Sequence, residues 1–279
     1  MGPARRGAGP SARAAVRRLR NPAAIVTATR AAALLGMLAS GYLFTFVSGP
    51  TAFALSRTDV PPLTWTDPKL VRETLGLDAG GNVFRLDTGP LKAALLGLPA
   101  VASADVSVAL PDAAVVVTIE ERQPVVAWQV GETRFIADRD GAVFAKVGKD
   151  ASVPAGVTVI DDRRGGAEPL AIDSHIDAVE FDVATRLGSL TPTDVGSTVS
   201  RLTVVITDLD GFIVAAQGGW TAVFGVYSPA TRSTAMIPGQ VRLLRSLLIG
   251  RENTLGRIIL ASETDGTYIP KPTPEASAR

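Results

Sequence analysis

The chain has 279 residues, of which 46% are apolar and 20% are charged, a composition typical of folded proteins rather than of disordered ones. It contains no cysteine, which excludes disulfide bridges, thiolate zinc sites and cysteine nucleophiles. The single histidine is His175, so a histidine-dependent catalytic or metal site has to use that residue. The length allows one large or two small folded units.

Charge is distributed unevenly along the chain. Residues 1–30 contain seven arginines and no Asp or Glu, so the net charge of +1 combines +7 in this arm with −6 in the remainder. A basic arm on an acidic body is typical of a segment that faces anionic lipid or nucleic acid. The arm has no aromatic residue for base stacking and no lysine, and it directly precedes an apolar run. We therefore expect lipid contact and no nucleic-acid partner.

The apolar run extends over 26 uncharged residues, from Ala31 to Ser56. Because about 20 helical residues cross the hydrocarbon core of a bilayer, the run predicts a single transmembrane anchor at 31–55. The helix is expected to begin near Ile25 and to end near Gly49-Pro50, since proline cannot continue it. The excess of arginine before the anchor predicts a cytoplasmic arm at 1–30 and an extracytoplasmic body, which is a type II topology in the plasma membrane.

Two other interpretations of this segment are open. Ala52-Phe53-Ala54 has the small-residue pattern of a signal-peptide cleavage site, although the basic region and the apolar run are both longer than usual for a signal peptide. A buried helix of a soluble protein is the second, and it would normally show a polar face. The uncleaved anchor is the preferred hypothesis.

Residues 56–122 predict a small α+β module. Residues 58–69 favour an edge strand or an extended lead-in. Asp67 and Pro68 then provide the N-cap and first residue of a helix that continues to Leu75 and ends at Gly76. The remaining predicted features are buried side chains at Val83, Phe84 and Leu86, a helix at Pro90–Leu98 capped by Asp87 or Thr88, and strands at Val101–Val108 and Val115–Glu121. This order, β-α-α-β-β, predicts two helices on one face of a three-stranded sheet.

Residues 123–270 predict a larger, mostly antiparallel β domain. The expected strands are Val125–Val130, Thr133–Ala137, Ala142–Lys146, Val157–Ile160, Val179–Val183, Ser200–Thr207, Phe212–Ala216, Ala222–Tyr227, Arg257–Ala261 and Thr267–Pro270. One helix is expected at Gln240–Ile249, where leucines recur at helical spacing. The Pro-rich tail at 271–279 is expected to be disordered.

Three local patterns suggest chemistry, and each has a simpler explanation. Asp138–Gly141 and Asp208–Gly211 each read D-x-D-G, which resembles the start of a calcium loop, but strand-like runs flank both, so hairpin turns are favoured. His175 lies between Ser174 and Asp177, yet neighbours in sequence do not form a catalytic triad. Adjacent Glu120 and Glu121 point to opposite faces of a strand, and Glu121 with Arg122 favours a pair at a domain junction. We expect no catalytic residue, cofactor or metal site.

Several strings resemble the FtsQ/DivIB family of bacterial cell-division proteins. In the small module these strings are Leu75-Gly76-Leu77, Gly81–Asp87, Leu98–Val101, Ala104–Val106, Leu110-Pro111 and Glu121–Trp128. They resemble a POTRA domain of the FtsQ type together with its "ER-P-A-W" junction. Beyond residue 150 the resemblance is one of architecture more than of residues.

This resemblance implies a non-enzymatic scaffold of the divisome at the division septum. The family recruits FtsB (DivIC) and FtsL, which are small bitopic division proteins, and through them the septal peptidoglycan synthase. In the family, the partner adds a strand to the last strand of the β domain, beside a helix. The corresponding residues here are Thr267, Tyr268, Ile269, Arg242 and Arg245. Pro270 removes one donor from that edge, and the family's usual "IDLR" string is replaced by Ile258–Glu263.

Two alternatives belong to other classes of protein. A membrane-anchored cell-envelope enzyme would need catalytic residues beyond His175. A POTRA protein that assembles outer-membrane proteins would need a long membrane β-barrel, and about 150 residues with an amphipathic helix do not supply one.

Overall fold

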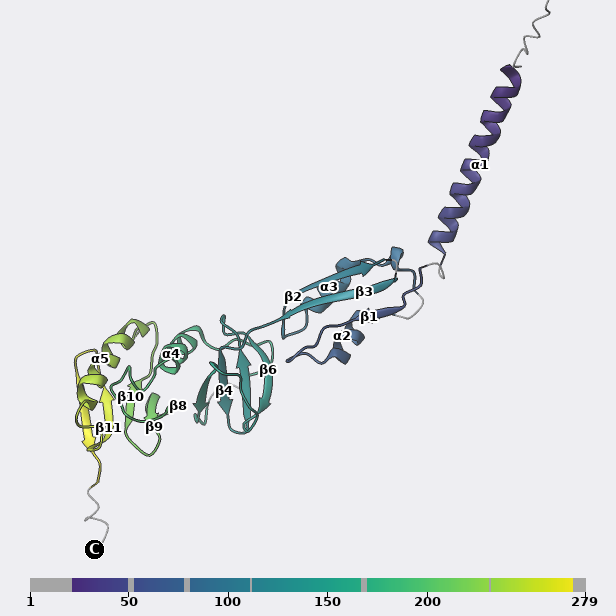
Figure 1. Ribbon diagram of the computed structural model, residues 1–279. Helices are drawn as coiled ribbons and strands as arrows, with labels where there is room; N and C mark the ends of the chain where they lie inside the picture. Colours follow the sequence, from purple (N-terminus) through teal and green to yellow (C-terminus); the bar gives the residue numbers. More distant parts are fainter. Residues whose placement is uncertain are drawn as a thin grey trace, which may run out of the picture. The chain divides into compact units, whose positions relative to one another are not determined.

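The structure is a computed structural model that describes residues 22–49, 53–77, 81–110, 112–166, 170–230 and 232–272 (Figure 1). Most of the basic arm and of the C-terminal tail lie outside these residues, as does the predicted cleavage position at Ala52. The chain divides into two compact units. One contains residues 1–56 and 78–86, and the other contains residues 57–77 and 87–279.

The first unit is dominated by helix α1, Pro22–Ser48, which confirms the predicted helix (Figure 1). Its segment Thr29–Val47 is long and apolar enough to cross a membrane, and none of it is buried in the protein. At 1.5 Å per residue these 19 residues span about 28 Å, close to the thickness of a hydrocarbon core. The unit also contains the short 3₁₀ helix η1, Val83–Arg85.

The second unit begins with a small module that has the predicted order of strands and helices. Its elements are β1 Arg57–Asp59, α2 Pro68–Leu75, α3 Thr88–Leu96, β2 Val101–Ala109 and β3 Ala114–Glu121. The strand order is β1-β3-β2, with β1 parallel and β2 antiparallel to β3. Helix α2 contacts α3, and α3 packs on β2. Val71, Leu75 and Leu95 provide the buried helix contacts.

The helix ends in this module follow the predicted capping residues. The Asp67 carboxylate accepts a hydrogen bond from Lys69 N at 2.8 Å, and Gly76 ends α2 in the left-handed conformation, at φ 56°. Asp87 caps α3 through Gly89 N at 3.0 Å. Of the three predicted buried side chains in the neighbouring loop, Val83 is buried and Leu86 is half-buried. The prediction for Phe84 is wrong, since its side chain is 53% exposed.

The larger domain is built on one nine-stranded sheet with the order β12-β11-β10-β9-β8-β7-β4-β5-β6 (Figure 1). The strands are β4 Val126–Val130, β5 Thr133–Ala137, β6 Val143–Gly148, β7 Thr158–Asp162, β8 Leu202–Thr207, β9 Gly211–Ala216, β10 Thr221–Gly225, β11 Leu255–Leu260 and β12 Gly266–Pro270. Three pairs of strands are parallel, namely β4 with β7, β7 with β8 and β10 with β11, and the rest are antiparallel. The helices are α4 Ala178–Gly188, η2 Thr234–Met236 and α5 Ile237–Leu248. The predicted mostly antiparallel domain with a C-terminal helix is confirmed.

One predicted strand is wrong. Val179–Val183 lies in α4, although its apolar residues alternate as they would in a strand. The Asp177 carboxylate accepts hydrogen bonds from Val179 N at 2.9 Å and Glu180 N at 3.0 Å, which caps a helix. Val183, Ala184 and Leu187 are then buried on one helical face, against the main core. The cap at Asp177 and the helical spacing of the buried residues favour a helix more strongly than the β-branched valines favour a strand.

Both D-x-D-G segments are hairpin turns, as predicted. Asp138–Gly141 joins the antiparallel strands β5 and β6, and Asp208-Leu209-Asp210 joins β8 and β9. At the first turn the Asp138 carboxylate accepts bonds from Asp140 N and Ala142 N. Gly211 follows the second turn at φ 65°, and a Cβ there would collide with the carbonyl of Gly225. A glycine is therefore required at position 211.

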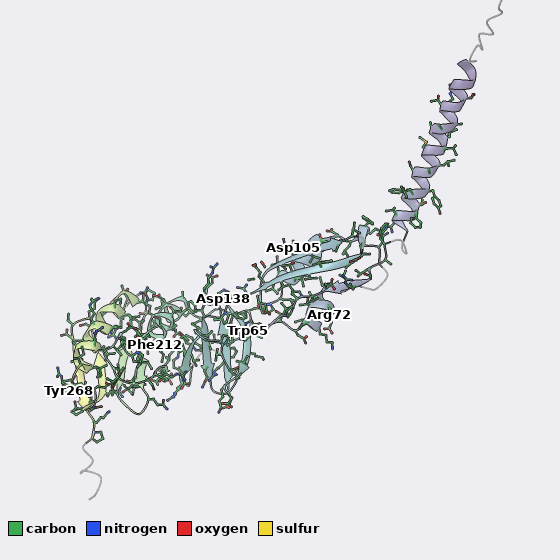
Figure 2. All side chains as sticks on the ribbon, viewed as in Figure 1. Trp65, Arg72, Asp105, Asp138, Phe212 and Tyr268 are labelled. Carbon is green, nitrogen blue, oxygen red and sulfur yellow. The ribbon has the colours of Figure 1, made fainter. Side chains whose placement is uncertain are left out.

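Glu121 and Arg122 lie where the small module meets the large sheet, but they bind different groups. The Glu121 carboxylate accepts hydrogen bonds from the backbone N–H groups of residues 64, 65 and 66 at 2.6–2.8 Å. The Arg122 guanidinium donates to Pro99 O at 2.9 Å and to the Asp138 carboxylate at 2.5 Å. Trp65 packs edge-on against Phe144 of β6, with ring centroids 5.7 Å apart. Trp65 and Asp138 are labelled in Figure 2.

Candidate partner-binding edge of the large sheet

Three of the five residues that the sequence suggested for partner binding, Thr267, Tyr268 and Ile269, lie at one end of the nine-stranded sheet. Among the described strands, β12 is terminal and pairs only with β11. All five residues of β12 are exposed, including Tyr268, which is labelled in Figure 2. The large apolar side chains of Tyr268 and Ile269 are 46% and 54% exposed. The free side of this strand is therefore a sheet edge open to another chain.

The register of β11 and β12 determines which backbone groups face outward. Ala261 N donates to Asp265 O at 2.9 Å, and Lys271 N donates to Thr254 O at 2.8 Å, so odd-numbered residues of this segment bond to β11. Because bonded and non-bonded positions alternate along an antiparallel pair, Gly266, Tyr268 and Pro270 direct their backbone groups outward. Tyr268 offers both a donor and an acceptor there, whereas Pro270 offers only its carbonyl.

The side chains of the edge are divided between two faces of the sheet. A Cβ on Gly266 would lie 3.3 Å from Leu243 of α5, and Tyr268, two residues on, lies on the same face. Thr267 and Ile269 lie on the opposite face. There Ile269 is paired across the ladder with Arg257, whose guanidinium binds the Asp210 carboxylate at 2.5 Å.

Arg242 and Arg245 are both exposed on α5 but point away from the edge strand. At 100° per residue they lie about 100° and 160° around the helix from Leu243, whose side chain lies near Gly266 of β12. The Arg245 side chain lies against the loop at 194–196, with its Cγ 3.1 Å from where a Cβ on Gly196 would be. The structure therefore brings Thr267, Tyr268 and Ile269 together on one strand and places the two arginines on a separate side of α5.

Gln240 holds two of the last strands in place, although no pattern in the sequence distinguishes it. Its side chain is fully buried, and its Nε2 donates to Phe224 O at 3.3 Å and to Leu260 O at 3.0 Å. Its Oε1 accepts from the Tyr227 hydroxyl at 2.6 Å, and burial raises the pKa of that hydroxyl. Phe224 and Leu260 are close to the carboxyl ends of the parallel strands β10 and β11, so Gln240 joins these two ends to α5. A polar residue in a helix gives no sign in the sequence that it will be buried.

Arg232 and Glu252 support the same strands from two sides. Arg232 donates to Phe224 O and, at 2.8 Å, to Ala261 O, just before the β11–β12 turn. The Glu252 carboxylate, just before β11, accepts from Ser197 Oγ, from Thr198 N at 3.0 Å and from Trp220 Nε1 at 3.1 Å. Burial alone would raise the pKa of Glu252, but these hydrogen bonds outweigh it and lower the pKa to about 2.

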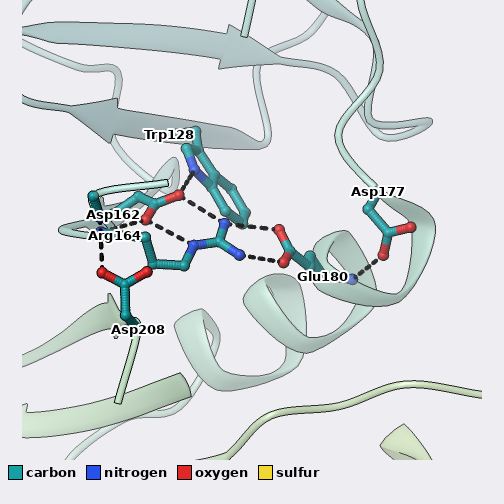
Figure 3. Close-up of polar contacts among 7 residues, drawn as sticks. Trp128, Asp162, Arg164, Asp177, Glu180 and Asp208 are labelled. Atoms are coloured by element: carbon teal, nitrogen blue, oxygen red, sulfur yellow. Dashed lines mark hydrogen bonds and ion pairs between the residues drawn. The ribbon is translucent and has the colours of Figure 1, made fainter. Parts of the chain in front are cut away.

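A second polar cluster lies in the middle of the sheet, where Arg164 joins β7 to α4 (Figure 3). The Asp162 carboxylate accepts from Trp128 Nε1 at 3.0 Å and from Arg164, and Arg164 also binds Glu180 at 2.5 Å. Burial alone would raise the pKa of Asp162, but the bonds from Arg164 and Trp128 outweigh it and lower that pKa. Trp128 is almost fully buried, so the cluster satisfies its indole N–H inside the core.

His175 lines a cavity of about 430 Å³ next to this cluster. Its backbone forms an isolated antiparallel bridge with Ala142. The neighbouring Ser174 hydroxyl donates to Ala171 O at 2.7 Å, and the Asp177 carboxylate caps α4. The polar side chains on either side of His175 therefore hold the backbone of a turn and of a helix end.

The small module matches a known family model, and most of the chain is similar to known proteins. Residues 63–122 match the family model described as "POTRA domain, FtsQ-type". The chain is similar to the cell division protein FtsQ of Chloroflexus aurantiacus, at 24% identity over 243 residues that cover 84% of this chain and 79% of the relative. It is also similar to the cell division protein FtsQ of Chloroflexus aggregans, at 26% identity over 225 residues that cover 77% of this chain and 74% of the relative.

The fold and these matches define a class of protein. One N-terminal apolar helix long enough to span a membrane is followed by a POTRA domain and by a larger, mostly antiparallel sheet domain with a C-terminal helix. This is the organisation of a single-pass membrane protein with a POTRA domain. The domain match and the two relatives over most of the chain support the FtsQ/DivIB family, and with it a cell-division protein.

Proposed function

We propose that this chain is a non-enzymatic scaffold of the division machinery that binds its partner by strand addition at β12. The observation that carries the proposal is the outward-facing backbone of Gly266, Tyr268 and Pro270 on a fully exposed terminal strand. A strand laid along this edge would form hydrogen bonds with Tyr268 on both sides of its Cα, and the exposed side chains of Tyr268 and Ile269 would add apolar contact area.

The proposed partners are single-pass division proteins of the FtsB/DivIC and FtsL type, and through them the septal peptidoglycan synthase. In the proposed topology the arginine-rich arm at 1–30 is cytoplasmic and contacts anionic lipid, the anchor occupies 31–55, and the domains at 56–122 and 123–270 are extracytoplasmic. The similarity to two FtsQ proteins supports the division role. Arg242 and Arg245 are exposed on another side of α5 from β12, so they would attract an acidic segment of the partner that continues past the docked strand and around the helix.

A proline at position 268 tests the docking mode directly. Because Tyr268 directs its N–H outward, Tyr268→Pro removes a donor for the partner while leaving the bonds between β11 and β12 intact. We expect at least a tenfold loss of partner capture from membranes of the dividing host. Tyr268→Ala is the matched control, since it removes the side chain and keeps the backbone donor, and it should retain more binding than Tyr268→Pro.

Localisation separates the division role from the docking mode. A fusion whose reporter matures outside the cytoplasm should concentrate at the septum, and depletion of the protein should block division. Septal enrichment with normal partner capture by Tyr268→Pro would reject strand addition and keep the division role. Uniform labelling of the envelope in dividing cells, with normal division on depletion, would reject the division role itself. His175→Ala should leave division unchanged, and loss of function in that variant would favour an enzyme.

A further inference from the structure

The end of helix α1 is bound by a loop that comes from more than thirty residues further along the chain. This loop, residues 81–86, is called the clasp here. Leu55 N donates to Gly81 O at 2.7 Å, Val83 N donates to Phe53 O at 3.1 Å, and Ala54 and Asn82 form an antiparallel bridge. All of these residues belong to the same compact unit as α1. The clasp is therefore paired with residues 53–55, the segment that follows the apolar helix.

Asn82 makes the most direct contact with the helix. Its Nδ2 donates to Val47 O at 2.8 Å and to Gly49 O at 2.7 Å, and its Oδ1 accepts from Phe84 N at 2.9 Å. The last carbonyl groups of a helix have no partner within the helix, and water is scarce near the hydrocarbon of a bilayer. A side-chain amide that supplies two donors at this point satisfies carbonyls where the apolar span ends.

Two exposed aromatic rings lie beside this cap. Phe53 and Phe84 pack edge-to-face, with centroids 4.8 Å apart and an angle of 89° between the ring planes. Their side chains are 38% and 53% exposed. Phe53 has φ 53°, a left-handed backbone conformation that bulky residues rarely adopt, so the surrounding contacts have to hold it there. Residues 53 and 84 thus expose two large apolar side chains, one of them on a backbone conformation that only its surrounding contacts maintain.

Their depth relative to a bilayer follows from the hydrogen bonds of Asn82. Phe84 N lies within about 8 Å of Val47 O, the length of one carboxamide with a hydrogen bond at each end. Val47 is the last residue of the segment Thr29–Val47, which can cross a membrane. The headgroup layer on each side of a bilayer is several ångströms thick, and aromatic side chains are enriched in it. A bilayer crossed by Thr29–Val47 would therefore hold the rings at the depth of the headgroup layer of the leaflet in which α1 ends.

We propose that Phe53 and Phe84 form a membrane-contact surface that inserts into this headgroup layer, with the lipid itself as the partner. Asn82 positions the surface by fastening the clasp to the end of α1. This inference depends on α1 as a membrane span and is independent of the proposed role in division. The clasp would then fix the protein to the membrane at a second point, just after the helix leaves the hydrocarbon.

The absence of cysteine makes a depth measurement straightforward. Phe84→Cys in the full-length chain, labelled with an environment-sensitive fluorophore, would be reconstituted into vesicles of phosphatidylcholine and phosphatidylglycerol. Vesicles carrying quenchers at the headgroup or at the end of the acyl chain would report the depth. Leu209→Cys is the control, because Leu209 is 88% exposed at a hairpin tip in the other unit.

We expect the label at position 84 to be quenched more strongly by headgroup quenchers than by acyl-end quenchers. Its quenching by aqueous iodide should be at least threefold weaker than that of the label at position 209. Iodide quenching as strong as at position 209 would overturn the proposal, and so would protection from iodide without quenching by lipid, which would mean that protein covers the site.

Asn82→Asp tests the positioning role of Asn82. Aspartate keeps the oxygen that accepts from Phe84 N and loses both donors to the helix end. We expect quenching by lipid at position 84 to fall at least twofold in this variant, with the helical content of the chain unchanged. Unchanged quenching by lipid would show that the cap does not position the rings and would overturn that part of the proposal.

Discussion

The two ends of the nine-stranded sheet are built differently. At the β6 end, Val143 N donates to Ser174 O and Val143 O accepts from Asp173 N, both at 2.9 Å, so part of this edge is paired with a neighbouring loop. Phe144 of the same strand is buried against Trp65 of the POTRA domain. At the β12 end, every residue of the strand is exposed.

This difference indicates which end is available to a partner. Open edges invite pairing with other chains, and proteins usually cover them or interrupt them with charge or proline. The β6 end is partly covered, by the loop bonds of Val143 and by the packing of Trp65 on Phe144, whereas the β12 end carries only Pro270 and Lys271 as interruptions. The buried side chain of Gln240 binds the carboxyl ends of β10 and β11, the two strands nearest to β12 in the sheet, and does not cover the edge. A sheet with one closed and one open end is suited to bind a strand at a single, defined place.

Removing the buried support behind the open end should have the largest effect on stability. Gln240→Leu leaves Leu260 O and the Tyr227 hydroxyl without their buried partner, and each such group costs about 1–3 kcal/mol. We expect a loss of about 3 kcal/mol in the free energy of unfolding, measured by denaturant titration of the full-length protein with tryptophan fluorescence. Gln240→Glu, which keeps an acceptor for Tyr227, is an informative control. A loss below 1 kcal/mol for Gln240→Leu would contradict this role.

Proline substitutions along β12 test which of its backbone N–H groups face β11 and which face outward. Thr267 directs its N–H toward β11 and Tyr268 directs its N–H outward, so only Thr267→Pro breaks the ladder. We expect Thr267→Pro to cost about 2–3 kcal/mol and Tyr268→Pro less than about 1 kcal/mol. Thermal unfolding of the two variants under one set of conditions provides the measurement. Equal losses would mean that the register differs from the one described.

The closed end should be weakened by Arg122→Ala. This change removes the ion pair with Asp138, whose side chain is 8% exposed, and the bond to Pro99 O. Because Asp138 keeps its bonds from Asp140 N and Ala142 N, we expect a loss of about 2 kcal/mol in the free energy of unfolding. Partner binding at β12 should stay within twofold of that of the unchanged protein. A loss of binding as large as that of Tyr268→Pro would show that the two ends are coupled.

At neutral pH the effect of pH on stability at the open end is negligible, and it becomes visible only in acid. Glu252 has a pKa of about 2 in the folded protein, against 4.5 as its ordinary value. A depressed pKa stabilises the fold above pH 4.5, and this contribution is lost as the pH falls from 4.5 toward 2. The Glu252→Gln variant should therefore be less stable than the unchanged protein at neutral pH. Its stability should also change less between pH 4.5 and 2, as measured by unfolding midpoints between pH 6 and 2.5. Parallel curves for the two proteins would exclude Glu252 as a source of the dependence.

Local signals in the sequence were sufficient for most of the elements. The cap at Asp67, the end of α2 at Gly76 and the two D-x-D-G turns each depend on a few adjacent residues, and the structure confirms them. The predicted strand at Val179–Val183 is wrong because, over so few residues, apolar positions fit the period of a helix as well as that of a strand. The cap at Asp177 and the buried helical face that includes Leu187 favour the helix. Phe84 failed because an apolar side chain in a loop was assumed to be buried.

By itself, the sequence determined the apolar span, the order of strands and helices in the POTRA domain and the strand that contains Thr267, Tyr268 and Ile269. Each of these depends on composition or on spacing within a single segment. Only the tertiary structure decided that β12 is the terminal strand, that Tyr268 directs its backbone outward and that Arg242 and Arg245 lie on another side of α5. It also decided the burial of Gln240 and the binding of Asn82 to the end of α1. These features depend on contacts between segments tens of residues apart, and the periodicity of a single segment carries no information about its distant partners.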